Sequence, residues 1–297
     1  MMQYRYVTNY KDNESIRAAL NQLTRETFGF DFESWYQNGY WKEDMYMPHS
    51  LMDGERMVAN VSANRMEFVI GGESKHYIQI GTVMTAKEYF GQGLGRYLIE
   101  KVINTYRDGC DGIYLFGNDS VLDYYPKFGF QVSKEYIYKK QLPVDEVKEE
   151  SLENNKFGEF IKIENPSNED RIKFFDYVKQ AVSNDGMTMR NVGLMGFYLH
   201  DLEDVYYSES LDTYVVANIE NHALHLSCII AKEKVKLEDI LDSFSEVADE
   251  VILDFTPSNK DGFEVEEFEE DCTLFYIGED LKRIEREHLH FPVVSHA

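Results

Sequence analysis

A glycine-rich loop is the part of this 297-residue sequence whose residue types and spacing most plainly suggest chemistry. Glu88–Gly95 reads EYFGQGLG and stands between a strand-like run and a helix-like run. Glycines at alternate positions let consecutive backbone N–H groups converge on one point at a helix start, where the helix dipole is positive. The loop therefore indicates a phosphate site. The alternative is a tight turn whose glycines serve only the backbone geometry.

The same spacing excludes two common phosphate-binding loops. The third glycine comes too early for the dinucleotide-binding pattern GxGxxG, and no Gly-Lys-Ser/Thr follows as in a P-loop. A second element lies downstream of the strand-like run Gly112–Phe116. It begins at Asn118 and ends in Tyr124–Phe130, which reads YYPKFGF.

Together the two elements resemble the GNAT superfamily, the GCN5-related N-acetyltransferases that use acyl-coenzyme A. The family pattern is R/Q-x-x-G-x-G/A at the start of a helix, then N-x-x-A-x-x-F-Y-x-K-x-G-F about two dozen residues later. Phe90–Gly95 and Asn118–Phe130 match these elements in the right order and at the right separation, and the resemblance spans roughly residues 2–142. It implies a GNAT fold of mixed α/β class and acetyl-CoA as co-substrate, with no metal.

The resemblance also implies residue roles. Backbone N–H groups of the loop would hold the coenzyme A pyrophosphate, the end of the fourth strand would pair with the pantetheine amides, and Asn118 would bind the pantetheine arm where the next strand splays away. Tyr125 would be the general acid that protonates the departing thiolate. The remaining coenzyme-binding residues would be Val83, Met84, Thr85, Gly91, Gln92, Gly93, Leu94, Gly95 and Arg96.

One residue departs from the family pattern. Phe90 stands where the family has Arg or Gln at the head of the loop. The backbone donors survive this change, but support for the loop is lost, and Lys87 nearby restores some positive charge. Two alternatives to an acetyltransferase stay open. Tandem domains of this kind resemble those of longer-chain acyltransferases, so the donor could carry a longer acyl chain, and Phe90 could mark a non-catalytic acyl-CoA sensor.

An amine acceptor would meet an aromatic wall. The helical segment Asp31–Trp41 and the loop Asp44–Ser50 precede the strands and are expected to cover the acceptor side. Aromatic faces hold cations, although the same residues could simply pack the core. The candidate acceptor-binding residues are Trp35, Tyr36, Tyr40, Tyr46 and His49, with Trp41 beside them. Glu33, Asp44 and Glu67 are undiscriminated candidates for the general base.

The C-terminal run Leu289–Ala297 is unusually apolar for a tail, so we expect it to dock on the protein. We hypothesise that it enters the active cleft, with His296 or the terminal carboxylate as the base. Deleting residues 295–297 should then cripple turnover and spare coenzyme affinity.

The whole sequence divides into two parts. Residues 1–142 form the expected GNAT domain, 143–157 a polar linker, and 158–297 a smaller α/β domain. The order of elements in the second part suggests a degenerate GNAT-like repeat, because Ala231–Lys236 (AKEKVK) stands where the glycine loop would be. An unrelated α/β domain is the alternative. Phe130–Lys139 is expected as one strand, and Gly262–Val265 with Thr273–Ile277 as a closing hairpin.

Composition restricts the partners. Lys and Arg number 30 against 54 Asp and Glu, a net charge of −24, so phosphate backbones and anionic membranes would be repelled and amines attracted. The three cysteines, Cys110, Cys228 and Cys272, have neither disulfide nor metal-ligand spacing. No apolar run suggests a signal peptide or a membrane span. We expect a cytoplasmic N-acetyltransferase that moves an acetyl group to a small cationic amine.

Overall fold

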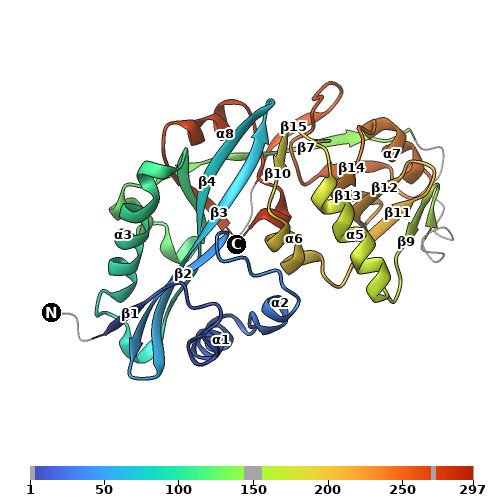
Figure 1. Cartoon of the computed structure of the whole chain (residues 1–297). Coiled ribbons are helices and arrows are strands. Elements are labelled where there is room, and N and C mark those ends of the chain that lie inside the picture. Colours follow the sequence, from blue (N-terminus) through green and yellow to red (C-terminus); the bar gives the residue numbers. More distant parts are fainter. Residues whose placement is uncertain (1–3, 144–155, 269–271, 297) are drawn as a thin grey trace.

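The computed structural model describes residues 4–143, 156–268 and 272–296, and it contains two eight-stranded sheets (Figure 1). The first sheet has the order β1-β2-β3-β4-β5-β16-β6, and β10 pairs with β3. Its strands are β1 (Arg5–Val7), β2 (Tyr46–Asp53), β3 (Arg56–Ile70), β4 (Glu73–Thr85), β5 (Gly112–Asn118), β6 (Gln131–Ser133), β10 (Met187–Met189) and β16 (Cys272–Ile277). Parallel and antiparallel pairs both occur, which confirms the mixed α/β class.

The second sheet has the order β15-β7-β14-β13-β12-β11-β9-β8. Its strands are β7 (Glu135–Gln141), β8 (Lys156–Phe157), β9 (Phe160–Lys162), β11 (Val205–Ser208), β12 (Thr213–Glu220), β13 (Ala223–Ala231), β14 (Glu250–Leu253) and β15 (Glu264–Phe268). In both sheets a hairpin leads to a parallel pair, β4 with β5 in the first and β13 with β14 in the second.

The two sheets exchange a strand, which the sequence did not predict. Strand β7 leaves the first part of the chain and pairs with β14 and β15, while β16 returns from the C-terminal part and pairs with β5 and β6. The expected hairpin Gly262–Val265 with Thr273–Ile277 is therefore wrong, as is the single strand Phe130–Lys139. Local patterns indicate a strand but not its partner, because pairing depends on residues far away in the sequence.

Helices cover both faces of the first sheet. α3 (Leu94–Tyr106) packs on one face, and α1 (Glu14–Phe28) with α2 (Glu33–Gln37) covers the other (Figure 1). α6 (Val192–Leu199) lies between this second face and the second sheet. The remaining α-helices of the described chain are α5 (Asn168–Gln180), α7 (Leu237–Phe244) and α8 (Arg283–Arg286).

Local chemistry explains where α1 begins and ends. The Asn13 side chain accepts a hydrogen bond from the Ile16 amide, and Gly29 ends the helix in a left-handed conformation (φ +84°). The region after α1 differs from expectation. α2 has only five residues, and Tyr46–Asp53 forms strand β2 where a loop Asp44–Ser50 was expected. Seven of the eight β2 residues are buried, so both faces of this strand pack against other elements.

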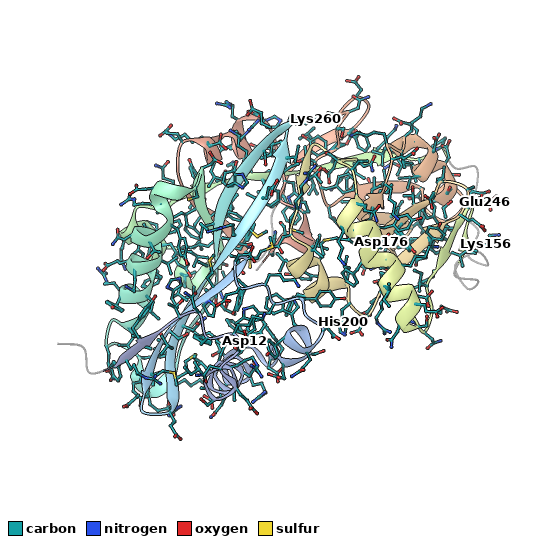
Figure 2. All side chains as sticks on the ribbon, viewed as in Figure 1. Asp12, Lys156, Asp176, His200, Glu246 and Lys260 are labelled. Atoms are coloured by element: carbon teal, nitrogen blue, oxygen red, sulfur yellow. The ribbon has the colours of Figure 1, made fainter. Side chains whose placement is uncertain are left out.

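Side chains fill the space between the first sheet and the second part of the chain, and labelled charged residues such as Asp12, Asp176 and Glu246 lie on the exposed outside (Figure 2). Among the described helices, none is long and apolar enough to cross a membrane. The described residues also contain no group of three or more His, Cys, Asp or Glu side chains placed to hold a metal ion.

Candidate active site

Strands β4 and β5 separate like the arms of a V. They pair only from Tyr77–Gln79 to Gly112–Tyr114, whereas β4 stays paired with β3 as far as Thr85 and β5 stays paired with β16. Within the described chain, the backbone of β4 beyond Gln79 therefore has one open edge. A ligand with amide groups could add to this edge like a further strand. The expected splaying at the end of β4 is present.

A bulge lies halfway along this open edge. Thr82 and Val83 together stand opposite the single residue Val61 of β3, and Thr82 has a φ of +45°, which is strained for a β-branched residue. The Asn60 side-chain amide donates to the Thr82 carbonyl at 2.9 Å. This contact helps to hold the bulge, where the regular ladder between β3 and β4 is interrupted.

The glycine loop leads from β4 into α3 and borders a cavity of about 510 Å³. Gly91 and Gly93 have φ values of +78° and +75°, so side chains there would be strained. The lining residues are Thr27, Val83, Met84, Thr85, Tyr89, Phe90, Gly91, Gly93, Leu94, Gly95, Arg96 and Tyr124. Eight of the ten predicted coenzyme-binding residues are thus in one cavity.

The start of α3 is suited to an anion. Its first-turn amides have no partner within the helix, its N-cap Gly93 offers no side-chain acceptor, and its first turn contains no acidic residue. Arg96 lies in the same turn and lines the cavity. Phe90, which replaces the family's polar residue, is 63% exposed on the rim.

The two other predicted coenzyme residues lie outside this cavity. The Gln92 side chain accepts a hydrogen bond from the Tyr4 hydroxyl at 2.8 Å, which ties the loop to the chain before β1. Asn118 ends β5, at the tip of the other arm of the V, and its side chain accepts from the Ser120 amide and hydroxyl. Asn118 therefore stands where the strands have separated, as predicted, but its amide oxygen is occupied by a local turn.

Tyr125 packs in the core of the first sheet and is not among the described residues that line the cavity. It is only 5% exposed, its ring contacts Phe275 with centroids 5.3 Å apart, and burial raises the pKa of its hydroxyl to about 12. The neighbouring Tyr124 lines the cavity itself, and its hydroxyl lies 3.3 Å from the position that a side chain at Gly95 would occupy. The sequence pattern pointed to Tyr125 and missed Tyr124 as a wall of this cavity, which we call the coenzyme cavity after its predicted ligand.

A second cavity, of about 180 Å³, opens on the face of the sheet covered by α1, α2 and α6. We call it the aromatic pocket. Half of its lining is aromatic: Phe30, Phe32, Trp35, Tyr40, Tyr46, Phe197 and Tyr198. Its other lining residues are Met45, Asn64, Thr82, Asn191, Gly193, Leu194 and His296.

Three of the five predicted acceptor residues line this pocket, and two do not. Trp35, Tyr40 and Tyr46 form part of its wall. Tyr36 instead stacks under the guanidinium of Arg17, 3.7 Å from its ring centre. His49 is on the opposite face of β2, between the hydroxyls of Tyr6 and Tyr106 at 2.6 and 2.9 Å. Side chains alternate along a strand, so a strand that holds Tyr46 in the pocket turns His49 toward α3.

Part of the pocket comes from residues that the sequence patterns did not single out. Helix α6 contributes Leu194, Phe197 and Tyr198, and its glycines permit close contact with the segment after α2: a Cβ on Gly196 would lie 2.4 Å from the Tyr40 ring. The sequence feature that could have identified α6 as part of the pocket is its apolar run VGLMGFYL, which contains two glycines three residues apart. A paired small-residue pattern of this kind allows close packing, but it does not name the partner.

The C-terminal tail docks as expected and reaches the aromatic pocket. Leu289, Phe291 and Val294 are buried. The His296 ring stacks on Phe116 of β5 at 3.7 Å, and its backbone carbonyl accepts a hydrogen bond from Tyr198. Its Nε2 atom is buried without a hydrogen-bond partner in the described structure, and burial lowers the pKa of the imidazole to about 4.

Other candidate bases are less well placed. Glu33 is held by Arg17 at 3.1 Å and by Asn21 at 2.9 Å, away from the pocket, and the hydrogen bond from Arg17 lowers its pKa. Asp44 and Glu67 line a different cavity, near Cys110. Neither cavity beside the bulge includes an acidic residue among its described lining residues.

Comparisons with known proteins agree with this geometry. Residues 9–133 match the family model described as an acetyltransferase (GNAT) domain. No curated protein matches the chain. Among solved structures, a GCN5-related N-acetyltransferase from Kribbella flavida is 17% identical, with a TM-score of 0.53 over 92% of this chain and 71% of that chain.

Two further structures are similar across both halves. A probable N-acyltransferase from Enterococcus faecalis V583 is 12% identical, with a TM-score of 0.59 over 95% of this chain and 74% of that chain. Eis1 from Mycobacterium abscessus is 11% identical, with a TM-score of 0.56 over 92% of this chain and 72% of that chain. At these identities the structural likeness shows the shared fold.

Proposed function

We propose that the protein transfers an acetyl group from acetyl-CoA to a small cationic amine, a proposal that the match of residues 9–133 to the acetyltransferase (GNAT) domain model supports. The single observation that carries this proposal is the position of the bulge. Thr82 lines the aromatic pocket, and the next residue, Val83, lines the coenzyme cavity. An acyl group bound along β4 would therefore meet an acceptor held in the aromatic pocket at the bulge.

Each part of the coenzyme cavity has a role in this reaction. The amides from Gly91 to Arg96 would bind the pyrophosphate, and the open edge at Val83–Thr85 would pair with the pantetheine amides. As the amine nitrogen attacks the thioester carbon, negative charge develops on the carbonyl oxygen. A backbone N–H at the bulge would stabilise it, and such a preorganised donor lowers a barrier by ~3 kcal/mol.

Two proton transfers complete the chemistry. When the C–S bond breaks, the Tyr125 hydroxyl would donate its proton to the thiolate. With a pKa of about 12, Tyr125 stays protonated at neutral pH and is ready to act as the acid. The ammonium form of the acceptor must release one proton to solvent before its nitrogen can attack. The attacking nitrogen then loses a second proton, and we propose His296 Nε2 as its acceptor, because the lowered pKa keeps the imidazole neutral. Attack makes the nitrogen far more acidic, so a weak base suffices.

The net charge of −24 supports a cationic acceptor, because an acidic surface concentrates amines near the entrance. The aromatic faces of the pocket can then hold a cation. The acidic surface acts on the approach of the acceptor, and its effect requires no carboxylate inside the pocket.

Transfer of a longer acyl chain is the second candidate. The observation that favours it is the apolar aromatic pocket at Thr82, which could receive an acyl tail instead of an acceptor. Comparing acetyl-CoA with hexanoyl-CoA in the same thiol-release assay separates the two. A preference for hexanoyl-CoA would assign the pocket to the donor. The exposed Phe90 keeps a non-catalytic acyl-CoA sensor as a third alternative.

The decisive experiment measures acetyl-CoA binding and turnover in variants that lack the His296 side chain. We expect acetyl-CoA to bind wild-type protein at one site in calorimetry, and thiol release to require an amine. His296→Gln and deletion of residues 295–297 should lower kcat about 100-fold and leave the acetyl-CoA Kd unchanged. Unchanged turnover in both variants would remove His296 from the mechanism. Absence of acetyl-CoA binding at millimolar concentration would overturn the enzyme and the sensor together.

A further inference from the structure

The aromatic pocket is selective as well as apolar. We propose that the acceptor is a monoamine whose remaining body is uncharged and apolar, and that amines with a second positive charge are excluded. This inference rests on the proposed function, since it names the substrate class of the same site. It narrows the acceptor from small cationic amines in general to those with one amino group.

The size of the pocket limits the acceptor. The pocket encloses about 180 Å³, close to the ~150 Å³ of an apolar cavity that holds one benzene molecule. One aromatic ring or a short alkyl chain would fill it. A multi-ring amino sugar would not enter without displacing the tail or α6.

The wall of the pocket offers no counter-charge. Among the described residues that line it, none is Asp, Glu, Lys or Arg. A second ammonium group on the acceptor would lose its water and find no partner of opposite charge, which is strongly unfavourable in an apolar site. The reacting amino group avoids this penalty by entering the pocket as the neutral amine, after it has released its proton to solvent, whereas a diamine must release a second proton as well.

Most polar atoms of the wall are already engaged in hydrogen bonds. The Trp35 indole donates to the Gly193 carbonyl at 2.7 Å, and the Asn191 side chain accepts from the Leu194 amide at 2.9 Å. The Tyr46 hydroxyl accepts from Ser62 at 2.9 Å. His296 Nε2 is the buried side-chain atom of this wall that lacks a partner in the described structure. The wall therefore offers one buried side-chain atom that is free to anchor an amine.

The aromatic rings provide the apolar surface for the body of the acceptor. Trp35 contacts Phe32 and Tyr46 with ring centroids 5.8 and 5.2 Å apart, and Phe197 approaches both Trp35 and Phe32 at 6.4 and 6.0 Å. Rings packed in this way have fixed positions, so they select for shape. Phe197 comes from α6, so the second part of the chain contributes to acceptor choice.

A matched pair of amines tests the inference. Pentylamine and 1,5-diaminopentane have the same chain length and differ in the second amino group. We expect kcat/KM for pentylamine to exceed that for the diamine at least about tenfold. Equal or greater activity with the diamine would overturn the proposal.

A substitution in α6 tests the cause. Phe197→Glu places a carboxylate in the wall of the pocket. It should shift the ratio of kcat/KM for pentylamine to kcat/KM for 1,5-diaminopentane about tenfold toward the diamine. Phe197→Leu, the matched control, changes the shape without adding charge and should preserve the preference for pentylamine. If Phe197→Glu does not fold, the wild-type ratio decides alone; if it folds and the ratio stays unchanged, charge exclusion is wrong.

Binding measurements separate this inference from the proposed function. Trp35 lines the pocket, so its fluorescence should report amine binding to the protein saturated with coenzyme A, even without turnover. Binding of pentylamine but not of the diamine supports the inference. Equal binding of both, or binding of neither, contradicts it. Failure of acetyl-CoA to bind in calorimetry contradicts the proposed function instead.

Discussion

Helices α3 and α7 make the same connection in different halves of the molecule: α3 joins β4 to the parallel strand β5, and α7 joins β13 to the parallel strand β14. Their starts have opposite chemistry. α3 follows Gly91-Gln-Gly-Leu-Gly95 and has no acidic residue in its first turn, whereas α7 follows Ala231–Lys236 and begins with Glu238 and Asp239. A helix start with two carboxylates repels the anion that α3 is suited to hold.

Shared topology is therefore not enough to make a coenzyme site. The positions after the parallel strand differ as well: β5 leads to Asn118 and the two tyrosines, while β14 leads to Thr256-Pro-Ser-Asn259. The Thr256 hydroxyl accepts a hydrogen bond from the His290 amide at 2.8 Å, so it secures the C-terminal tail. The second half contributes α6, the tail and strand β16 to the first half.

Placing a carboxylate in the first turn of α3, as α7 has in its own first turn, should cause the largest loss of acetyl-CoA affinity. Gly95→Asp introduces a carboxylate where the pyrophosphate is proposed to bind, and its Cβ would approach the Tyr124 hydroxyl at 3.3 Å. Two like charges about 4 Å apart repel by ~4 kcal/mol near a protein surface, so acetyl-CoA affinity should fall at least about 100-fold. Calorimetry measures this directly, and an unchanged Kd would mean that the pyrophosphate binds elsewhere.

The matched control removes charge from α7. The double variant Glu238→Gln with Asp239→Asn makes the α7 start more like that of α3 but adds no glycine loop. We expect the stoichiometry to stay at one acetyl-CoA per chain and Kd to stay within about twofold. A second binding site in this variant would mean that acidity alone had silenced the second half.

The next prediction concerns the tyrosines that follow β5 and have no counterpart after β14. Tyr125→Phe should lower kcat about 100-fold or more, because it removes the proposed proton donor, and should leave KM for acetyl-CoA nearly unchanged. Tyr124→Phe is the matched control one residue earlier, and its kcat should change by less than about threefold. Thiol-release kinetics on both variants decide the assignment. If the larger loss belongs to Tyr124, the residue that lines the cavity is the acid.

The sequence predicted the local elements of this fold better than their partners. Glycines at 91, 93 and 95 identified the loop before α3, and the strand-like run Gly112–Phe116 lies within β5. Strand exchange was not predictable, because β7 and β16 have ordinary strand patterns, and only the assembled sheets show that each lies in the sheet of the other half. Strand β2 was also missed, because both of its faces are buried and its sequence therefore lacks the alternation of apolar and polar residues that marks a half-exposed strand.

In the candidate site too, the residues that belong to a local sequence motif were predicted, and those that only the fold brings together were not. Residues fixed by a motif, such as Gly93 and Arg96, lie in the predicted cavity, because the motif is itself a local structure. The aromatic pocket joins α2, β2, α6 and the tail, which are far apart in the sequence. Aromatic composition alone could not tell Tyr46, which faces the pocket, from His49, which faces α3.

His49 in the first sheet and His225 in the second should change the stability of the fold in opposite directions as the pH falls. This is the smallest of the expected effects. Burial lowers the pKa of His49 from an ordinary value of 6.5 to about 4. Between pH 6.5 and pH 4 the unfolded chain therefore binds more protons at this residue than the folded chain does. The folded state loses stability as the pH falls through this range. Between pH 8 and pH 5 this costs about 2 kcal/mol. The hydrogen bond to Asp254 raises the pKa of the half-exposed His225, so this residue stabilises the fold below pH 6.5 and loses that contribution as the pH rises through its folded pKa.

Thermal unfolding from pH 5 to pH 9 separates the two histidines. Wild-type Tm should fall by roughly 4–8 °C from pH 8 to pH 5. His49→Gln should lessen that fall, and His296, whose pKa burial also lowers to about 4, should account for part of what remains. The Tm of His49→Gln at pH 8 should also drop because Tyr6 and Tyr106 lose their partner. His225→Gln should lower Tm at pH 6 and leave it unchanged at pH 9. A loss of Tm at pH 9 equal to that at pH 6 would mean that His225 stabilises the second sheet by packing, and the electrostatic contrast between the sheets would then rest on His49 alone.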